Sequence, residues 1–277
     1  MGHILVTGGT GKTGRRVVAD LRGRQIPCVA ASRSSSGVGE VTFDWSDPVT
    51  WEYAIRDVDA AYLIAPMGVS DPASLMIQFI EVARLEGVRR FVLLSASILP
   101  AGGPAMGQVH QFLQSSGAEW AVLRPSWFME NFTEGIHRRT IQEEHAIYTA
   151  AGHGRVPFIS ADDIASAAVT TLTSVEPSNT DFVLTGSQIL SYDDVARRIS
   201  EVIDSPITHF PLTFDELVAR HCSQGLSEQH AQTLAFMDLT IADGAEDRTT
   251  PDLGQLTGNP PLSFDEFTVR NAEMWRP

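Results

Sequence analysis

Glycines near the start of the chain have the spacing of a phosphate-binding turn. Gly9, Gly11 and Gly14 fit G-x-G-x-x-G, and Gly8, Gly11 and Gly14 also fit G-x-x-G-x-x-G. Glycine lets bare backbone approach a pyrophosphate, whose charge is met by the unpaired N–H groups and positive dipole end of a following helix. The residues predicted to contact a dinucleotide here are Gly8, Thr10, Gly11, Lys12, Thr13 and Gly14.

The segments on either side of these glycines support that prediction over an ordinary tight turn. The apolar run Ile4–Val6 precedes the loop, and the helix-like segment 15–21 follows it. Strand, glycine turn and helix is the context that gives the motif its meaning. A nucleotide-triphosphate P-loop is excluded, because the glycine required five positions before Gly11 is Val6.

The end of the next predicted strand bears on which dinucleotide binds. An acidic residue there reads a free ribose 2′-hydroxyl, whereas arginine accommodates a 2′-phosphate. Here Cys28–Ala31 runs into Ser32 and Arg33, with no carboxylate. We therefore expect NADP(H), with Ser32 and Arg33 at the 2′-phosphate and Lys12 as a second cation for the same phosphate. Asp44 follows the third predicted strand, where it either borders the adenine or caps a turn.

Composition limits the partners. The 277 residues are 43% hydrophobic and 19% charged, with a formal net charge of −14, which disfavours nucleic acid and anionic membranes. The two cysteines suit a reduced compartment, and neither has the neighbours of a metal site. We expect a cytoplasmic monomer or homodimer that binds a small molecule and no metal.

Alternation of apolar runs with helical patterns predicts an α/β fold, a Rossmann-type doubly wound parallel sheet. The predicted strands are Ile4–Val6, Cys28–Ala31, Val41–Phe43, Ala60–Ile64, Phe91–Leu94, Trp120–Leu123 and Phe182–Leu184. Helix starts are predicted at Asp47, Asp71, Ser160, Ser191, Thr213, Ser227 and Ser263. We expect an NADP-binding domain at 1–188 and a smaller, mainly helical substrate lobe at 189–277, over the carboxyl ends of the strands.

Several motifs carry a family resemblance. Gly8–Gly14, residues 90–97, 122–131 and 156–165 resemble the NmrA-like, atypical short-chain dehydrogenase/reductase family. Residues 31–35, 43–45 and 103–110 are similar to its festuclavine/agroclavine dehydrogenase branch and bacterial relatives. The resemblance implies that Ala65, Pro66 and Met67 run beside NADP(H), that Ser95 and Ser97 lie near the nicotinamide ribose, and that Pro125 and the residues after it flank the nicotinamide.

The chain departs from the usual catalytic pair of these enzymes. Short-chain dehydrogenases commonly use Tyr-x-x-x-Lys, but none of the four tyrosines has a lysine four residues on, and Lys12 is the sole lysine. Many NmrA-like sequences have a lysine in the region of Met106. Ketone reduction by the usual route is therefore not expected.

Candidate ligand contacts come from two further regions. His110 could protonate an enolate or phenolate product, although a satisfied core histidine fits its helical position equally well. The predicted substrate-binding residues are Met67, Met106, Trp127, Phe128, Asn131 and Met237, with packing in the core as the alternative for the apolar ones.

Together these features predict an NADPH-dependent oxidoreductase of specialised metabolism, such as alkaloid or antibiotic biosynthesis. It would transfer hydride to a conjugated, quinone or iminium-type acceptor of a small aromatic or polycyclic metabolite, because such acceptors need no concerted proton. Two alternatives remain: a non-catalytic NADP(H)-sensing regulator, and a tailoring enzyme for coupling or cyclisation.

Overall fold

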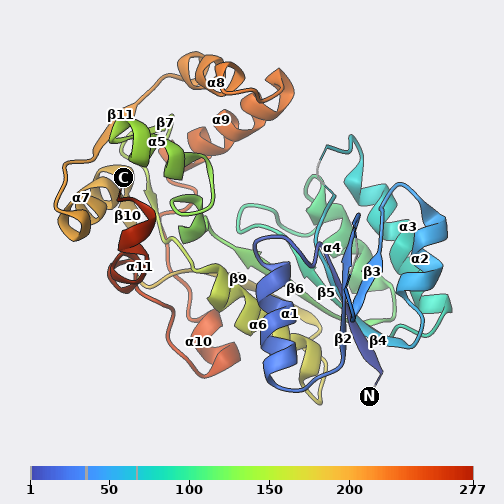
Figure 1. The fold of residues 1–277 in the computed structure, drawn as a ribbon. Helices are drawn as coiled ribbons and strands as arrows, with labels where there is room; N and C mark the ends of the chain where they lie inside the picture. Colours follow the sequence, from blue (N-terminus) through green and yellow to red (C-terminus); the bar gives the residue numbers. More distant parts are fainter. Residues whose placement is uncertain (1, 35–36, 67, 277) are drawn as a thin grey trace. The chain divides into compact units, whose positions relative to one another are not determined.

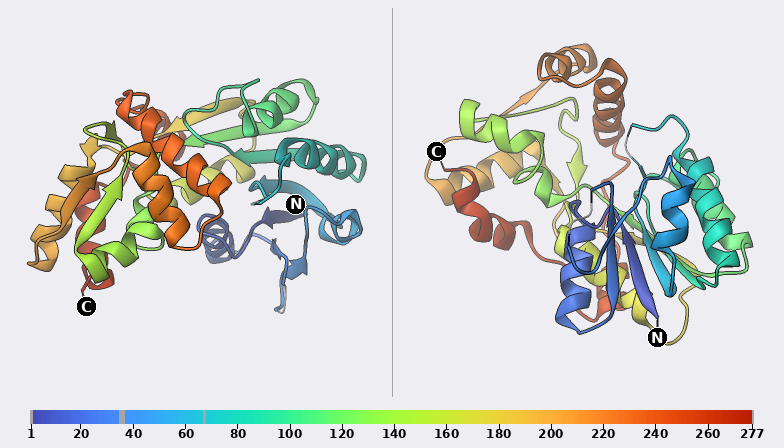
Figure 2. Two further views of the ribbon diagram at one scale, coloured as in Figure 1. Left: turned by 90° about the horizontal axis from the view of Figure 1, so that it is seen from above. Right: turned by 45° about the vertical axis from the view of Figure 1, so that its right-hand side comes forward.

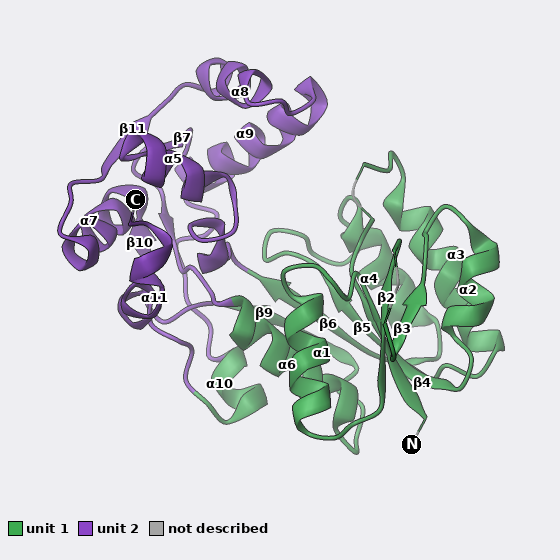
Figure 3. Cartoon of the chain, in the orientation of Figure 1, with its two compact units in different colours: residues 1–125, 161–184, 252–259 green, residues 126–160, 185–251, 260–277 purple. Residues whose placement is uncertain are grey.

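The computed structural model describes residues 2–34, 37–66 and 68–276, and the chain forms two compact units. The first comprises residues 1–125, 161–184 and 252–259, and the second comprises residues 126–160, 185–251 and 260–277 (Figure 3). The chain thus leaves the first unit after the sixth strand and returns to it twice. The predicted boundary at residue 188 is a single cut, so it differs from this discontinuous division.

The first unit contains a seven-stranded parallel sheet in the order β3-β2-β1-β4-β5-β6-β9 (Figure 1). Its strands are β1 (His3–Thr7), β2 (Cys28–Ser32), β3 (Glu40–Thr42), β4 (Val58–Leu63), β5 (Arg90–Leu94), β6 (Glu119–Pro125) and β9 (Thr180–Leu184). All seven predicted strands therefore occur, and the Rossmann-type fold is confirmed. The order reverses between β1 and β4, which is where such sheets open a crevice for ligands.

Helices cover both faces of this sheet (Figure 1 and Figure 2). On one face, α1 (Gly14–Gly23) packs against α6 (Ala161–Thr173). On the other lie α2 (Pro48–Ala54), α3 (Pro72–Leu85) and α4 (Met106–Ser115), whose buried side chains share one apolar cluster with the strands. The short α10 (Asp252–Thr257) contacts α6 and β9. Burial on both faces explains why the strands are nearly continuous apolar runs.

The second unit is mainly helical and contains two small two-stranded sheets. Its elements are η1 (Met129–Asn131), α5 (Ile136–Glu144), β7 (Ala146–Thr149), β8 (Arg155–Val156), β10 (Leu190–Ser191), α7 (Tyr192–Ile203), β11 (Thr208–Pro211), α8 (Phe214–Ser223), α9 (Glu228–Ala242), α11 (Phe264–Asn271) and η2 (Ala272–Met274). Strand β7 pairs with β11 in parallel, and β8 pairs with β10 antiparallel. The core groups Phe132, Phe158, Tyr192 and Phe264 in edge contacts.

Side-chain caps fix where most of the helices begin. Asp47 accepts a hydrogen bond from the Val49 amide, and Asp71 accepts one from the Ser74 amide, each ahead of a proline at the first helical position. Reciprocal capping boxes start α7, α8 and α11. In the part of the chain that the structure describes, no helix has the length and apolar character needed to cross a bilayer.

Candidate functional site

The glycine loop folds back tightly on itself between β1 and α1. The Gly11 amide donates to the Gly8 carbonyl at 2.8 Å, and Gly8 has a φ of +59°, in the left-handed region. A Cβ added at Gly14 would lie 2.1 Å from the Gly8 carbonyl oxygen. Only glycine therefore fits at position 14. The absence of a side chain there leaves the backbone at the start of α1 uncovered.

Contacts across the switch point hold this loop beside β4. The Thr7 hydroxyl donates to the Tyr62 carbonyl at 3.0 Å and accepts from the Ile64 amide at 2.8 Å. This bridge joins the last residue of β1 to Ile64, the first residue after β4. On the side of β2, the Gly9 amide donates to the Ala31 carbonyl at 2.9 Å. The loop is therefore anchored to both strands that flank β1 at the crevice.

The start of α1 faces the loop without a side-chain cap of its own. Thr13 is the N-cap residue and makes no capping hydrogen bond, whereas Thr10 and Gly11 are exposed. An uncapped helix start with an exposed glycine turn is the arrangement that binds a phosphate through backbone N–H groups. Beneath it, the Tyr62 side chain is fully buried, and burial raises the pKa of its hydroxyl far above the usual value.

The segments after β2 and β3 bring a cation and a carboxylate together. Arg33 is exposed, and the Ser32 hydroxyl donates to the Ser34 carbonyl at 2.9 Å; Ser35 lies outside the described residues. Asp44 accepts hydrogen bonds from the Ser46 hydroxyl at 2.6 Å and the Ser46 amide at 2.8 Å. These bonds lower the pKa of Asp44, and the charge of Arg33 adds to the effect. Asp44 therefore caps a turn, which is one of its two predicted roles.

The ends of β4, β5 and β6 place further predicted residues at the same edge of the sheet. Ala65 and Pro66 are half-buried after β4, whereas Met67 lies outside the described residues. The Ser95 amide donates to the Leu123 carbonyl at 2.8 Å, and Pro125 is the last residue of β6. The Ser95 hydroxyl is buried and has no hydrogen-bond partner among the described residues. A buried hydroxyl in that state normally needs a partner, such as a bound ligand.

Arg124 supports this edge and was not predicted from the sequence. Its guanidinium donates to the Asp181 carboxylate at 2.7 Å and to the Ser97 carbonyl at 2.8 Å. It therefore links β6 to β9 and to the segment that carries Ser95. An arginine directly after the apolar run Trp120–Leu123 was the available sequence signal.

His110 occupies a buried position on α4. Its side chain is 1% exposed, and its ring lies 5.6 Å from that of Trp120, the second residue of β6. Burial lowers the pKa of His110, and the carboxylate of Asp181 opposes that effect. The ring is buried as in the alternative interpretation, but its Nδ1 has no hydrogen-bond partner among the described residues, so it is not a fully satisfied core histidine. A role in proton transfer stays a prediction. Met106, at the start of α4, is also buried in the apolar cluster.

The other predicted substrate contacts belong to the second unit. Trp127, Phe128, Asn131 and Met237 are half-buried there. By contrast, Met129 and Phe132 are 1% and 0% exposed in the core. The partly exposed residues remain candidates for ligand contact, and the two core residues serve packing.

Asp238 on α9 is an acidic residue that the sequence did not single out. Its carboxylate accepts one hydrogen bond, from the Ala150 amide at 2.9 Å. Burial raises the pKa of Asp238 to about 7, and the Ala150 amide opposes this. A carboxyl that changes charge near neutral pH is a candidate for binding or catalysis.

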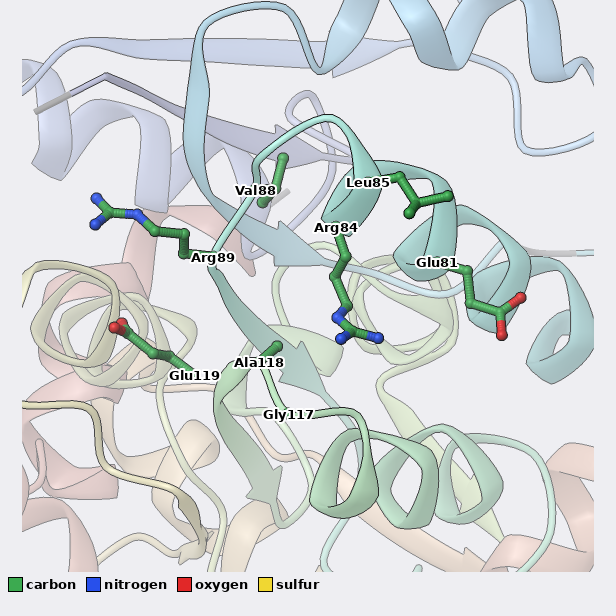
Figure 4. Close-up of a pocket in the computed structure, with 8 residues that line it drawn as sticks. All are labelled: Glu81, Arg84, Leu85, Val88, Arg89, Gly117, Ala118 and Glu119. Carbon is green, nitrogen blue, oxygen red and sulfur yellow. The ribbon is translucent and has the colours of Figure 1, made fainter.

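A surface groove of about 640 Å³ lies at the opposite edge of the sheet, near the start of β5 and β6. It is lined by Glu81, Arg84, Leu85, Val88, Arg89, Gly117, Ala118 and Glu119 (Figure 4). In that view Leu85 and Glu81 point away from Arg84, so the polar groups do not converge on one point. This groove is separate from the edge that carries the glycine loop.

The fold and the glycine-loop edge define a dinucleotide-binding protein of the Rossmann type. Residues 8–177 match the family described as NAD(P)H-binding. The chain is 40% identical to agroclavine dehydrogenase of Claviceps fusiformis over 284 residues, with 98% of each chain covered. It is 38% identical to the uncharacterized oxidoreductase YesF of Bacillus subtilis, covering 98% of this chain and 96% of the relative.

Among solved structures, triphenylmethane reductase of Citrobacter sp. complexed with NADP(H) is similar, with a TM-score of 0.83 and 25% identity. The match covers 97% of this chain and 99% of that one. The chain belongs to the NAD(P)H-binding, NmrA-like family of atypical short-chain dehydrogenases/reductases that includes the agroclavine dehydrogenases. Both the predicted family resemblance and the predicted nicotinamide dinucleotide cofactor are thereby confirmed.

Proposed function

We propose that this protein is an NADPH-dependent reductase that transfers hydride to a conjugated, quinone or iminium-type acceptor on a small aromatic or polycyclic metabolite. The observation that carries the proposal is that one edge of the sheet carries the glycine loop, Arg33 and the buried Ser95 hydroxyl. The family of the chain supports a nicotinamide cofactor there. The bound cofactor would supply the hydride.

The described residues fit such a cofactor in complementary ways. The missing side chain at Gly14 leaves the start of α1 open for a pyrophosphate, which backbone N–H groups would hold. Arg33 would pair with a ribose 2′-phosphate, and Ser32 and Lys12 would add polar contacts to it. Ser95 would donate or accept a hydrogen bond at the nicotinamide ribose, and Ala65, Pro66 and Pro125 would line that end of the site.

The proposed class of hydride acceptor is inferred from the absence of a Tyr-x-x-x-Lys proton donor. Without a Tyr-x-x-x-Lys pair, the chain has no tyrosine whose pKa a lysine four residues on could lower. An iminium carbon already carries positive charge, so hydride transfer to it needs position and orientation rather than a proton. The relatives named agroclavine dehydrogenase and triphenylmethane reductase support an aromatic or polycyclic substrate and a place in specialised biosynthesis.

The test mixes purified protein with NADPH and a panel of cyclic iminium ions, quinones and enones while nicotinamide absorbance is followed. We expect oxidation of NADPH with at least one acceptor. In the Arg33→Asp variant, the KM for NADPH should rise far more than the KM for NADH. Arg89→Asp is the matched control, because Arg89 is also exposed but lies at the opposite edge of the sheet. Tight NADPH binding with no turnover of any acceptor would instead favour the NADP(H)-sensing regulator.

A further inference from the structure

Arg16 lies in the first turn of α1, and its side chain reaches back to the glycine loop. Its guanidinium donates one hydrogen bond to the Lys12 carbonyl oxygen at 2.8 Å and another to the Asp162 carboxylate at 2.8 Å. Asp162 stands in the first turn of α6, which packs against α1 within the first unit. The Arg16 side chain is only 19% exposed. One side chain therefore ties the loop to the starts of two helices.

A second arginine, at the other end of α1, forms an ordinary surface ion pair. Arg24 donates to the Asp20 carboxylate at 2.7 Å and 2.9 Å, and its side chain is 46% exposed. Exposed pairs between residues four apart contribute little to stability. Arg16 differs because its carboxylate partner, Asp162, lies 146 residues away and because it also holds a loop carbonyl. These contacts fix the loop rather than the helix.

The Lys12 carbonyl and the Thr13 amide belong to one peptide group. This group is trans, so its C=O and N–H point in opposite directions. Arg16 holds the C=O on the side of the helix, which directs the Thr13 N–H out of the start of α1. The dihedral angles of Thr13, φ −86° and ψ −40°, agree with that orientation. Gly11 precedes this group and has no side chain to restrict its rotation.

We propose that Arg16 is a positioning residue for the dinucleotide, because through the Lys12 carbonyl it aims the Thr13 N–H at the pyrophosphate. Asp162 holds the guanidinium of Arg16 in place for this role. The inference deepens the proposed function and rests on it for the position of the pyrophosphate at the glycine loop. Without Arg16, the peptide group could rotate and present its carbonyl oxygen to the phosphate, which would repel it.

The two arginines of the proposed site should have different effects on cofactor choice. Arg33 would contact the 2′-phosphate, which NADPH has and NADH lacks. Arg16 would act on the pyrophosphate, which both cofactors share. Loss of Arg16 should therefore weaken the two cofactors by the same factor, whereas loss of Arg33 should weaken NADPH selectively.

The experiment compares the wild type with Arg16→Met, which keeps an unbranched stem and good helix propensity but has no donor. Fluorescence titration of the full chain should show the Kd values of NADPH and NADH both raised about tenfold. Arg24→Met is the matched control, because it removes the same charge from the same helix, and it should bind both cofactors as the wild type does. Calorimetry with 2′-AMP, which lacks the pyrophosphate, should give the same affinity in Arg16→Met and wild type.

A second variant separates positioning from charge, since removal of a positive charge alone weakens the binding of an anion. The combination of Arg16→Met with Asp162→Asn removes one charge of each sign and should still bind both cofactors about tenfold more weakly. Wild-type affinity in this double variant, or a larger loss for NADPH than for NADH, would show that only the charge of Arg16 matters. Loss of 2′-AMP binding would show general damage to the site. Each of these results, or unchanged Kd values in Arg16→Met, overturns the positioning role.

The Thr13 amide supplies a spectroscopic readout of the same contact. In the ¹⁵N-labelled wild type, NADP⁺ should move the Thr13 amide proton resonance downfield, as a hydrogen bond to phosphate does. Saturating NADP⁺ should move it less in Arg16→Met. A Thr13 resonance that does not respond to NADP⁺ in the wild type overturns the inference.

Binding and turnover separate this inference from the proposed function. At saturating NADPH, Arg16→Met should keep the kcat of the wild type, with only the KM raised. Weaker binding in Arg16→Met without reduction of any acceptor by the wild type would support the positioning role and overturn the reductase. Turnover by the wild type with an equal KM for NADPH in Arg16→Met would support the reductase and overturn the positioning role.

Discussion

The Asp238→Asn substitution should stabilise the protein, although it only replaces one carboxylate oxygen with an amide NH2 group of similar size. The pKa of Asp238 rises from 3.8 in the unfolded chain to about 7 in the folded one. A raised carboxyl pKa means that the folded state prefers the protonated form. The carboxyl therefore costs no stability below pH 3.8, an increasing amount between pH 3.8 and about 7, and a constant amount above that.

The size of the effect follows from that difference. A shift of about three pKa units corresponds to about 4 kcal/mol at about pH 8. Because Asp238 is half-buried and solvent screens part of its charge, we expect the variant to gain about 2 kcal/mol. At about pH 5 the gain should be less than half of that value, since the wild-type carboxyl is then mostly protonated in the folded state.

Urea unfolding of both proteins at the two pH values measures this difference, with Asp243→Asn as the control for loss of one acidic charge. The control should change the free energy of unfolding little, because Asp243 is exposed. A gain of the same size at both pH values would show that the charge of Asp238 is not its cause. Stability equal to the wild type at pH 8 would refute the argument that this carboxylate is uncompensated.

Three further substitutions test the glycine-loop edge, and a fourth, at Arg90, is a control at the start of β5. Arg33→Asp should raise the KM for NADPH at least about tenfold relative to that for NADH; unchanged discrimination between the cofactors would contradict the assignment of the 2′-phosphate. Gly14→Ala should destabilise the protein by about 2 kcal/mol or more and abolish NADPH binding, because its Cβ would lie 2.1 Å from a loop carbonyl oxygen. Normal fluorescence titration with NADPH would show that the loop is not the site. Arg124→Lys and Arg90→Lys should each cost about 1–2 kcal/mol, since both arginines bridge strands through a carboxylate at 2.7 Å. Only the former should reduce kcat, because it holds the segment after β5; equal effects on kcat would make Arg124 merely structural.

The parts of the fold that depend on neighbouring residues could be predicted from the sequence. The glycine loop, the Asp-Pro helix starts and the apolar strands all act within a few residues, and the structure contains them. Strands β7 and β8 could not be found in this way. Their pairing partners, β11 and β10, are far along the chain, and each strand is too short to show a period.

Within the candidate site, too, features set by neighbouring residues could be predicted, whereas contacts between distant parts of the chain could not. Ser32 and Arg33 could be assigned to the ligand-binding edge because they follow a predicted strand, and parallel strands end at one edge. Ser95 and Pro125 were assigned to it through the family resemblance. The interactions of Asp238 could not be predicted, because its hydrogen-bond partner lies 88 residues earlier in the sequence. Similarly, the sequence placed His110 in the helix after the fifth strand but could not decide between a ring that faces a ligand and one that packs in the core.

The protein compensates the charges within its sheet but not the charge of Asp238. Arg90 is buried and Arg124 half-buried in the same sheet, and each contacts a carboxylate and at least one backbone carbonyl. Both charges are paired within the protein, although the Nε of Arg124 has no hydrogen-bond partner among the described residues. Removal of either arginine should mainly change stability or the position of a neighbouring segment. Asp238 is compensated by one amide alone. If stability were the only constraint, asparagine would serve better at that position, since it would keep the hydrogen bond without the cost of desolvating a charge.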